Sequence, residues 1–248
     1  MADPKRRLLL AFDLDGTLAP IVSRPESANV DKATLKLLTR AARLPRVRVV
    51  VVSARPLRDL RRLVPDGRVK KIAQYGLEGP LAPAAATRRR IRKATRLMTA
   101  RLEPVVQPFR GAWIEPKGLS VAVHHRALSV GRRAALGHRL RDEERAAKAL
   151  GFGTQLGDRV NDFVPLGYDK GRALNALRAR FQPGATIFFG DSAGDEPAYA
   201  ALAPTDISVR VGPGPTAARY RVHGPQDVAR FIRAVVAERT QGPSSRRR

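Results

Sequence analysis

The chain has 248 residues, no cysteine and a formal net charge of +25 at pH 7. The absence of thiols excludes disulfides, thiolate catalysis and thiolate zinc sites. With 43% hydrophobic residues, the chain is long enough for one large core, or for a core and a smaller second domain. No apolar run approaches the roughly 18 residues that a transmembrane helix needs. We therefore expect a cytoplasmic protein with no membrane partner and no secretory signal.

The positive charge is spread along the whole chain, with two denser clusters at Arg88–Lys93 and Arg246–Arg248. Aromatic residues make up only 5% of the chain, and none interleaves with these clusters as a base-stacking platform would. We interpret most of the arginines as solvated surface and expect no specific nucleic-acid partner. The alternative that the charge leaves open is a non-catalytic basic protein that binds polyanions.

Strand and helix patterns alternate over residues 1–79. The apolar run Leu8–Phe12 predicts a buried parallel strand, which ends in Asp13-Leu14-Asp15-Gly16-Thr17. The following segments read in order as a helix at 31–43, a strand at 47–52, a helix at 57–63 and a strand at 71–74. Such alternation is typical of a parallel sheet with helices on both faces.

The pattern changes after Gly79, where Gly79–Pro83 reads as a linker. Residues 80–165 read twice as helix–strand–strand, which predicts a small inserted α+β domain. Its expected elements are helices at about 88–106 and 130–150 and strands at 113–115, 119–124, 154–156 and 160–164. The α/β pattern then resumes over 166–241, with helices at 170–180 and 227–239 and strands at 185–189 and 207–211. Residues 242–248 read as a basic, disordered tail.

Reactive side chains stand at four strand or helix ends of the predicted core. They are Asp13, Asp15, Ser53, Lys170, Asp191 and Asp195. Ligands of open α/β sheets bind outside the carboxyl ends of the strands. Two carboxylates crowded at one strand end need a compensating charge, and a divalent cation commonly supplies it. A hydroxyl and a lysine can hold an anionic oxygen. Taken singly, each of these groups also fits an ordinary turn, helix cap or solvated side chain.

Together, Asp13-x-Asp15-Gly-Thr, Ser53, Lys170 and Gly190-Asp191-x-x-x-Asp195 resemble the motifs of the haloacid dehalogenase superfamily of phosphatases. The resemblance covers nearly the whole chain. It implies an α/β fold with a Rossmann-like parallel-sheet core, residues 1–79 and 166–241, and an inserted smaller α+β cap domain, residues 80–165. It also implies a Mg²⁺ cofactor.

The resemblance implies a role for each matched residue. Asp13 would be the nucleophile that forms an aspartyl-phosphate, and Asp15 would be the general acid and base. Ser53 and the catalytic Lys170 would hold the phosphoryl oxygens. Asp13, the backbone carbonyl of Asp15 and Asp191 would bind Mg²⁺. Asp195 would not bind the metal directly and would instead orient a water molecule or Lys170.

Three further segments resemble the trehalose-6-phosphate phosphatases, namely Ala19–Val22, Gly76–Glu78 and Lys117–Arg126. In that family, a cap strand with the motif Glu-x-Lys-Gly recognises the sugar of the substrate. The resemblance implies that the protein hydrolyses trehalose 6-phosphate to trehalose and phosphate, a reaction of trehalose biosynthesis. We expect the protein to be a monomer. The cap residues that would bind this small-molecule substrate are Glu115, Lys117, Arg126 and Asp162.

Four positions depart from the family's pattern. Tyr75 replaces a histidine, Ala54 replaces a glycine, Asp162 replaces a glutamate and Ser192 replaces an aspartate. The catalytic groups are intact, so the departures concern the sugar more than the phosphate. A phosphatase of another sugar phosphate therefore stays open as the nearer alternative.

Overall fold

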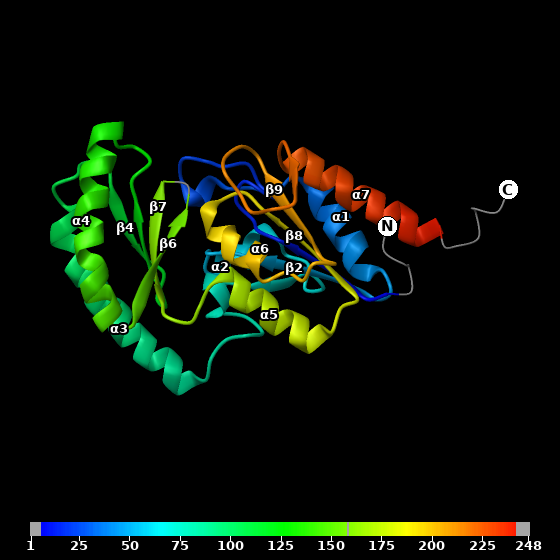
Figure 1. Cartoon of the computed structure of the whole chain (residues 1–248), viewed down its shortest axis with the longest axis horizontal. Coiled ribbons are helices and arrows are strands. Elements are labelled where there is room, and N and C mark those ends of the chain that lie inside the picture. Colours follow the sequence, from blue (N-terminus) through cyan, green and yellow to red (C-terminus); the bar gives the residue numbers. More distant parts are fainter. Residues whose placement is uncertain (1–5, 158, 242–248) are drawn as a thin grey trace. The chain divides into compact units, whose positions relative to one another are not determined.

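The computed structural model describes residues 6–157 and 159–241 and is shown in Figure 1. The chain forms two compact units. The first comprises the chain up to residue 81, residues 170–191 and the chain from 195 onward, and the second comprises residues 82–169 and 192–194. The expected domain junctions, after residues 79 and 165, lie two and four residues before the positions where the chain passes between the units. The expected tail, 242–248, lies outside the described residues.

The first unit is built on a six-stranded parallel sheet with the strand order β10-β9-β8-β1-β2-β3. The strands are β1 (Leu8–Phe12), β2 (Val47–Val52), β3 (Lys70–Ile72), β8 (Ala185–Gly190), β9 (Ile207–Val211) and β10 (Tyr220–Val222). The central strand β1 pairs with β2 on one side and β8 on the other, and all five of its residues are buried. This arrangement confirms the predicted α/β core.

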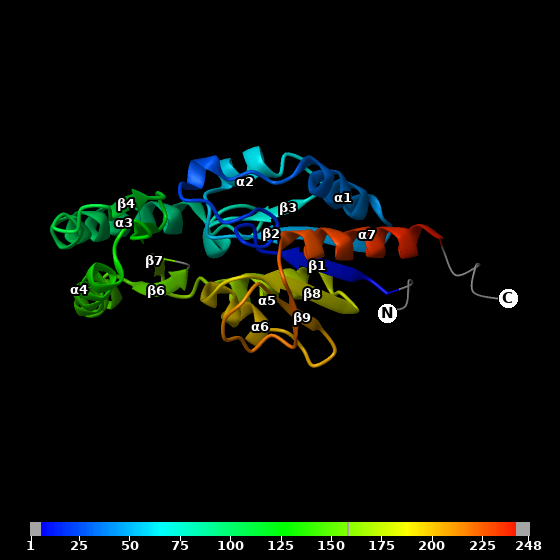
Figure 2. The same ribbon diagram turned by 90° about the horizontal axis from the view of Figure 1, so that it is seen from above.

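Helices cover both faces of this sheet, as Figure 2 shows. They are α1 (Lys32–Arg43), α2 (Leu57–Leu63), α5 (Lys170–Phe181), α6 (Glu196–Ala200) and α7 (Pro225–Gln241). Alternate residues of a strand point to opposite faces. Accordingly, Leu10 and Phe12 pack in one core with α1 and α7, whereas Leu9 and Ala11 pack in a second core with α5 and α6. Burial on both faces explains why β1 reads as a continuous apolar run rather than an alternating one.

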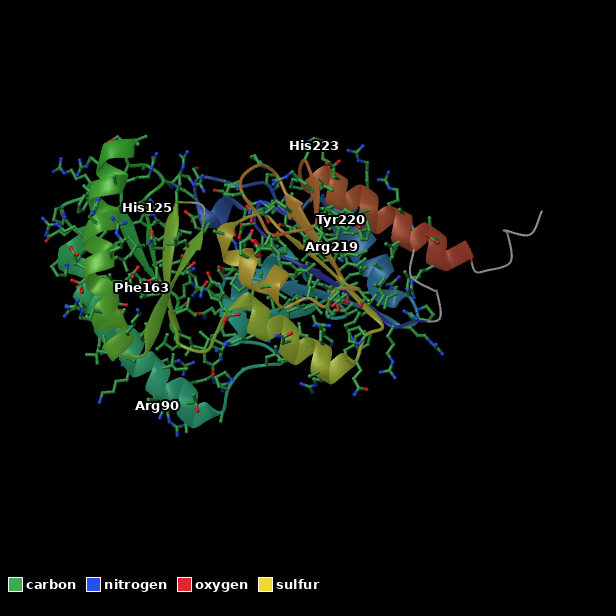
Figure 3. The ribbon with its side chains drawn as sticks, viewed as in Figure 1. Arg90, His125, Phe163, Arg219, Tyr220 and His223 are labelled. Atoms are coloured by element: carbon green, nitrogen blue, oxygen red, sulfur yellow. The ribbon has the colours of Figure 1, made fainter. Side chains whose placement is uncertain are left out.

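The second unit is a four-stranded antiparallel sheet with the order β4-β5-β7-β6. Its elements are α3 (Ala85–Val106), β4 (Trp113–Pro116), β5 (Val121–His124), α4 (Val130–Ala149), β6 (Phe152–Gly157) and β7 (Val160–Pro165). The two helices pack on one face, in a core around the fully buried Phe163, which is labelled in Figure 3. By the alternation of the strands, Glu115 and Asp162 lie on the opposite face. The predicted α+β domain is confirmed.

Several short elements were not predicted. The third strand was expected to reach residue 74 but ends at Ile72, because Gln74 and Tyr75 adopt left-handed backbone angles, with φ of 44° and 60°, in a 3₁₀ turn. The strand β10 and the helix α6 are too short for a periodic pattern to show. No helix in the described part of the chain is long and apolar enough to cross a membrane.

Candidate active site

The sheet of the first unit brings the predicted side chains to one edge. Phe12 of β1 lies beside Val51 of β2 and Phe189 of β8, so the three strands end at the same level. The residues that follow them are Asp13, Ser53 and Asp191. Asp13 continues the sheet, since its N–H donates to the carbonyl of Phe189 at 2.8 Å. The sequence separation between these groups is large, and only the sheet order brings them together.

Lys170 is the cation at the centre of this edge. Its Nζ lies 2.8 Å from Oδ1 of Asp13 and 2.7 Å from Oδ1 of Asp195. All three side chains are buried, with Asp195 fully inaccessible. The second oxygen of Asp195 accepts from the N–H of Asp191 at 3.0 Å. Asp195 therefore fixes both the lysine and the start of the loop after β8.

Burial and crowding shift the pKa values of these groups. Burial raises the pKa of Asp13 well above its usual value, Lys170 lowers it in part, and the neighbouring aspartates raise it further. Burial together with Asp195 raises the pKa of Asp191 to about 7. Burial by itself would lower the pKa of Lys170, but Asp13 and Asp195 outweigh it and raise the value. Two of the three carboxyl groups contact Lys170, and Arg210 attracts the third, Asp191, so negative charge stays in excess in the cluster.

The residues present fit a divalent cation. Asp13, Asp191 and Asp195 each offer an oxygen, and these oxygens lie within 4.8 Å of one another. Gly16, with φ of 73°, clears the space for one of them, because a Cβ at this position would lie 2.0 Å from Oδ2 of Asp191. Carboxylate oxygens are the donors that Mg²⁺ and Ca²⁺ prefer. Both oxygens of Asp195 already accept hydrogen bonds, which makes Asp13 and Asp191 the freer pair of ligands.

Asp15 lies outside the group of three carboxylates and is held by a residue that sequence reasoning missed. Arg55 binds both of its oxygens, at 2.7 and 2.8 Å. The signal in the sequence was the arginine of Ser53-Ala54-Arg55-Pro56, where only the serine was assigned a role. Ser53 is buried, and its Oγ accepts from the N–H of Arg55 at 3.2 Å.

The segment Gly76–Glu78 has a structural function. Oε2 of Glu78 accepts from the N–H of Leu57 at 2.6 Å, at the first residue of α2. The N-terminal N–H groups of a helix have no partner within the helix, so this carboxylate satisfies one of them. Glu78 thereby ties the start of α2, and the Arg55-Pro56 turn before it, to the loop after β3.

The second unit gathers three of the four predicted cap residues. Nζ of Lys117 lies 2.6 Å from Oδ1 of Asp162 and 4.0 Å from Oε2 of Glu115. The same Glu115 oxygen lies 2.8 Å from Nε2 of His124, whose ring stacks on Trp113 with centroids 4.0 Å apart. Antiparallel register places Glu115 and Asp162 on either side of Ala122. The fourth residue, Arg126, is half-buried in the turn after β5.

Comparison with known proteins gives a consistent picture. The family model described as trehalose-phosphatase matches residues 11–226. A bifunctional trehalose-6-phosphate synthase/phosphatase of Thermoproteus tenax is 32% identical over 89% of this chain and 30% of its own length. The trehalose-6-phosphate phosphatase of Escherichia coli is 27% identical over 90% of this chain and 85% of its own. An uncharacterized glycosyl hydrolase of Mycobacterium tuberculosis is 29% identical over 92% of this chain.

The chain spans only 18% of the Mycobacterium tuberculosis protein and 30% of the Thermoproteus protein. Among solved structures, a trehalose-6-phosphate phosphatase related protein superposes with a TM-score of 0.77 at 23% identity, covering 94% of this chain and 99% of the other. A haloacid dehalogenase-like hydrolase from Bacteroides thetaiotaomicron superposes with a TM-score of 0.61 at 14% identity, covering 92% and 98%. These structures share the fold of this chain.

Proposed function

Because the chain belongs to the trehalose-phosphatase family, we propose that it hydrolyses the phosphate ester of trehalose 6-phosphate. The observation that carries the proposal is the family match over residues 11–226, which includes the whole acidic cluster around Lys170. The names of the Thermoproteus and Escherichia coli relatives support the same substrate. The product alcohol would be trehalose and the second product inorganic phosphate.

Asp13 is the proposed nucleophile. It follows β1 at the centre of the sheet, and its Oδ1 is held by Lys170, which leaves Oδ2 as the attacking oxygen. The bond from phosphorus to the sugar oxygen breaks as the bond from phosphorus to Asp13 forms. The resulting aspartyl-phosphate is then hydrolysed, which returns the free carboxylate.

Asp15 is the proposed general acid and base. It is the more exposed of the two aspartates after β1, with its side chain 38% accessible, against 7% for Asp13. The leaving sugar oxygen needs a proton, and the hydrolytic water must lose one. One carboxyl group can perform both transfers, since the proton given in the first half-reaction is recovered in the second.

Ser53 and Lys170 are the proposed phosphate-binding residues. Both stand at the edge of the sheet beside Asp13, and both are buried. A hydroxyl and an ammonium group can donate to phosphoryl oxygens, and in a buried site these contacts are strong. Asp195, through its 2.7 Å contact, keeps the lysine ammonium in place.

We propose Mg²⁺ as the cation, held by Asp13 and Asp191 with the backbone carbonyl of Asp15. When bound, it would neutralise the excess negative charge and allow a carboxylate to approach a phosphate. Asp195, which binds Lys170 and the N–H of Asp191, would support the site by orienting both groups.

The sugar is the proposed ligand of Glu115, Lys117 and Asp162 in the second unit, with Arg126 as a fourth contact. Carboxylates and an ammonium group can accept from and donate to several sugar hydroxyls. Asp162 is one methylene shorter than the glutamate of the family, and Lys117 is already bound to it at 2.6 Å. This difference is the reason to keep another sugar phosphate as the second candidate.

Phosphate release from a panel of sugar phosphates, with and without Mg²⁺, tests the proposal. We expect release that requires the metal and is fastest with trehalose 6-phosphate. Faster release from a different sugar phosphate would favour the second candidate. Salt-dependent DNA binding without any phosphate release would favour the polyanion-binding alternative. Cytoplasmic location and a monomeric state stay predictions, checked by fractionation and by light scattering.

A further inference from the structure

Arg55 and Asp15 form a bidentate ion pair. Nε donates to Oδ2 at 2.7 Å and Nη2 donates to Oδ1 at 2.8 Å, across 40 residues of sequence. The flat guanidinium presents two parallel N–H groups that match the two oxygens of a carboxylate, and this match fixes direction as well as distance. A lysine could supply the positive charge but not the two parallel N–H donors.

Other contacts fix Arg55 itself. Its Nη1 donates to the carbonyl of Pro25 at 2.7 Å, its backbone N–H donates to Oγ of Ser53 at 3.2 Å, and its carbonyl accepts from the N–H of Gln74 at 3.0 Å. The Arg55 side chain is 10% exposed, whereas that of Asp15 is 38% exposed. The arginine is therefore the anchored partner of the pair and the carboxylate is the accessible one.

We propose that Arg55 is a positioning residue that orients Asp15 for proton transfer, a role that rests on the proposed phosphatase function. Two parallel N–H donors fix the plane and the direction of the carboxylate that they bind. The bond from Nη1 to the carbonyl of Pro25 holds the guanidinium in turn, so the side chain of Asp15 is held by a group that is itself anchored.

Both half-reactions use the carboxyl group that Arg55 orients. First, the proton of the Asp15 carboxyl moves to the sugar oxygen while the phosphorus–oxygen bond breaks and the bond from phosphorus to Asp13 forms. The Asp15 carboxylate that results binds Arg55 with both oxygens. It then accepts a proton from the water whose oxygen bonds to phosphorus, as the bond to Asp13 breaks. Arg55 keeps the side chain of Asp15 pointed in one direction for both proton transfers.

The test compares two substrates in the first turnover of Arg55→Ala, with enzyme in excess and rapid mixing. Trehalose 6-phosphate has an alkoxide leaving group that needs a proton, whereas p-nitrophenyl phosphate releases a phenolate that does not. Misplacing an acid catalyst costs about 100-fold. We therefore expect release of the sugar to slow by roughly that factor and release of nitrophenolate to change less than about 3-fold.

Two further variants control the comparison. Arg62→Ala removes an arginine whose Nη2 lies 3.4 Å from the carbonyl of Glu26, in the same 3₁₀ turn as Pro25, and it should leave both rates unchanged. Arg55→Lys keeps the charge without the two parallel donors and should show an intermediate loss with the sugar phosphate alone. If Arg55→Ala does not fold, Arg55→Lys takes its place in the comparison of the two substrates.

Equal losses with both substrates, or no loss with either, would overturn the role of Arg55 and leave it a structural residue. A failure of the proposed function looks different. In that case the unaltered protein releases no phosphate from trehalose 6-phosphate, whatever residue stands at position 55.

Discussion

The two units each build a cluster of carboxylates around one lysine, but they build it differently. In the first unit, Lys170 contacts Asp13 and Asp195, which follow or adjoin the ends of parallel strands that are distant in sequence. In the second, Lys117 contacts Asp162 and Glu115, which lie within antiparallel strands and meet through their register. The first cluster lies at a sheet edge, where ligands of α/β folds bind, and glycine makes room for its acids. The second lies on one face of an antiparallel sheet, with its lysine directly after β4. This difference fits the proposed division, in which the first cluster performs the chemistry and the second recognises the sugar.

The largest effect should come from Asp13→Asn. The amide is a poor nucleophile and a weaker metal ligand, so phosphate release should fall by at least about 10⁴-fold. Phosphate release from trehalose 6-phosphate measures the loss, and the exposed Asp142→Asn in the second unit is the matched control. Activity near that of the unaltered protein would break the assignment of chemistry to the first cluster.

Gly16→Ala should weaken metal binding by about 100-fold, a loss of the size caused by altering the surroundings of metal ligands. The added Cβ would lie 2.0 Å from Oδ2 of Asp191, in a backbone with φ of 73°. Gly151→Ala is the matched control, because its φ of 82° carries the same backbone strain while nothing lies within 4 Å of the new Cβ. Calorimetric titration with Mg²⁺ measures the affinities. Equal losses in the two variants would show that strain alone is responsible.

Metal affinity should rise with pH through the neutral range. Burial and Asp195 raise the pKa of Asp191 to about 7, so this acid carries a proton below neutral pH, and burial raises the pKa of Asp13 in the same direction. A cation must displace bound protons, and the affinity should increase by about tenfold per pH unit for each proton displaced. Titration at pH 6, 7 and 8 in two buffers with different ionisation enthalpies counts the protons released. An affinity independent of pH contradicts the prediction.

The smallest effect should come from the second cluster. Lys117→Met keeps the apolar stem and removes the ammonium, and we expect the KM for trehalose 6-phosphate to rise by about tenfold, the cost of one charged hydrogen bond. The kinetics with p-nitrophenyl phosphate, which has no sugar, should stay the same. Asp162→Glu lengthens this side chain by one methylene and should shift the preference between sugar phosphates. Equal losses on both substrates would mean that this cluster does not distinguish the sugar.

Much of the first cluster could be predicted from sequence because its residues occupy chain positions with a fixed meaning. An apolar run followed by Asp13-Leu14-Asp15-Gly16 predicts both the strand and the residue at which it ends. A parallel sheet then brings the carboxyl ends of its strands together. The partner of Asp15 could not be predicted in this way. Its pairing with Arg55 depends on where one long side chain turns, which no short motif specifies. Likewise, contact between Lys117 and Asp162 depends on the register of β5 with β7, a tertiary property.

The pairing of β1 with β8 has a consequence for how the protein folds. Leu8 lies beside Ala185 in the finished sheet, so the centre of the parallel sheet joins segments on either side of the second unit. Contacts so distant in sequence form slowly, because a long loop must close before they contribute. During synthesis β1 can pair early with β2, but its other side must wait until β8 emerges after the second unit. One side of this buried apolar strand therefore stays unpaired until late in synthesis, and an unpaired strand of this kind is prone to aggregation.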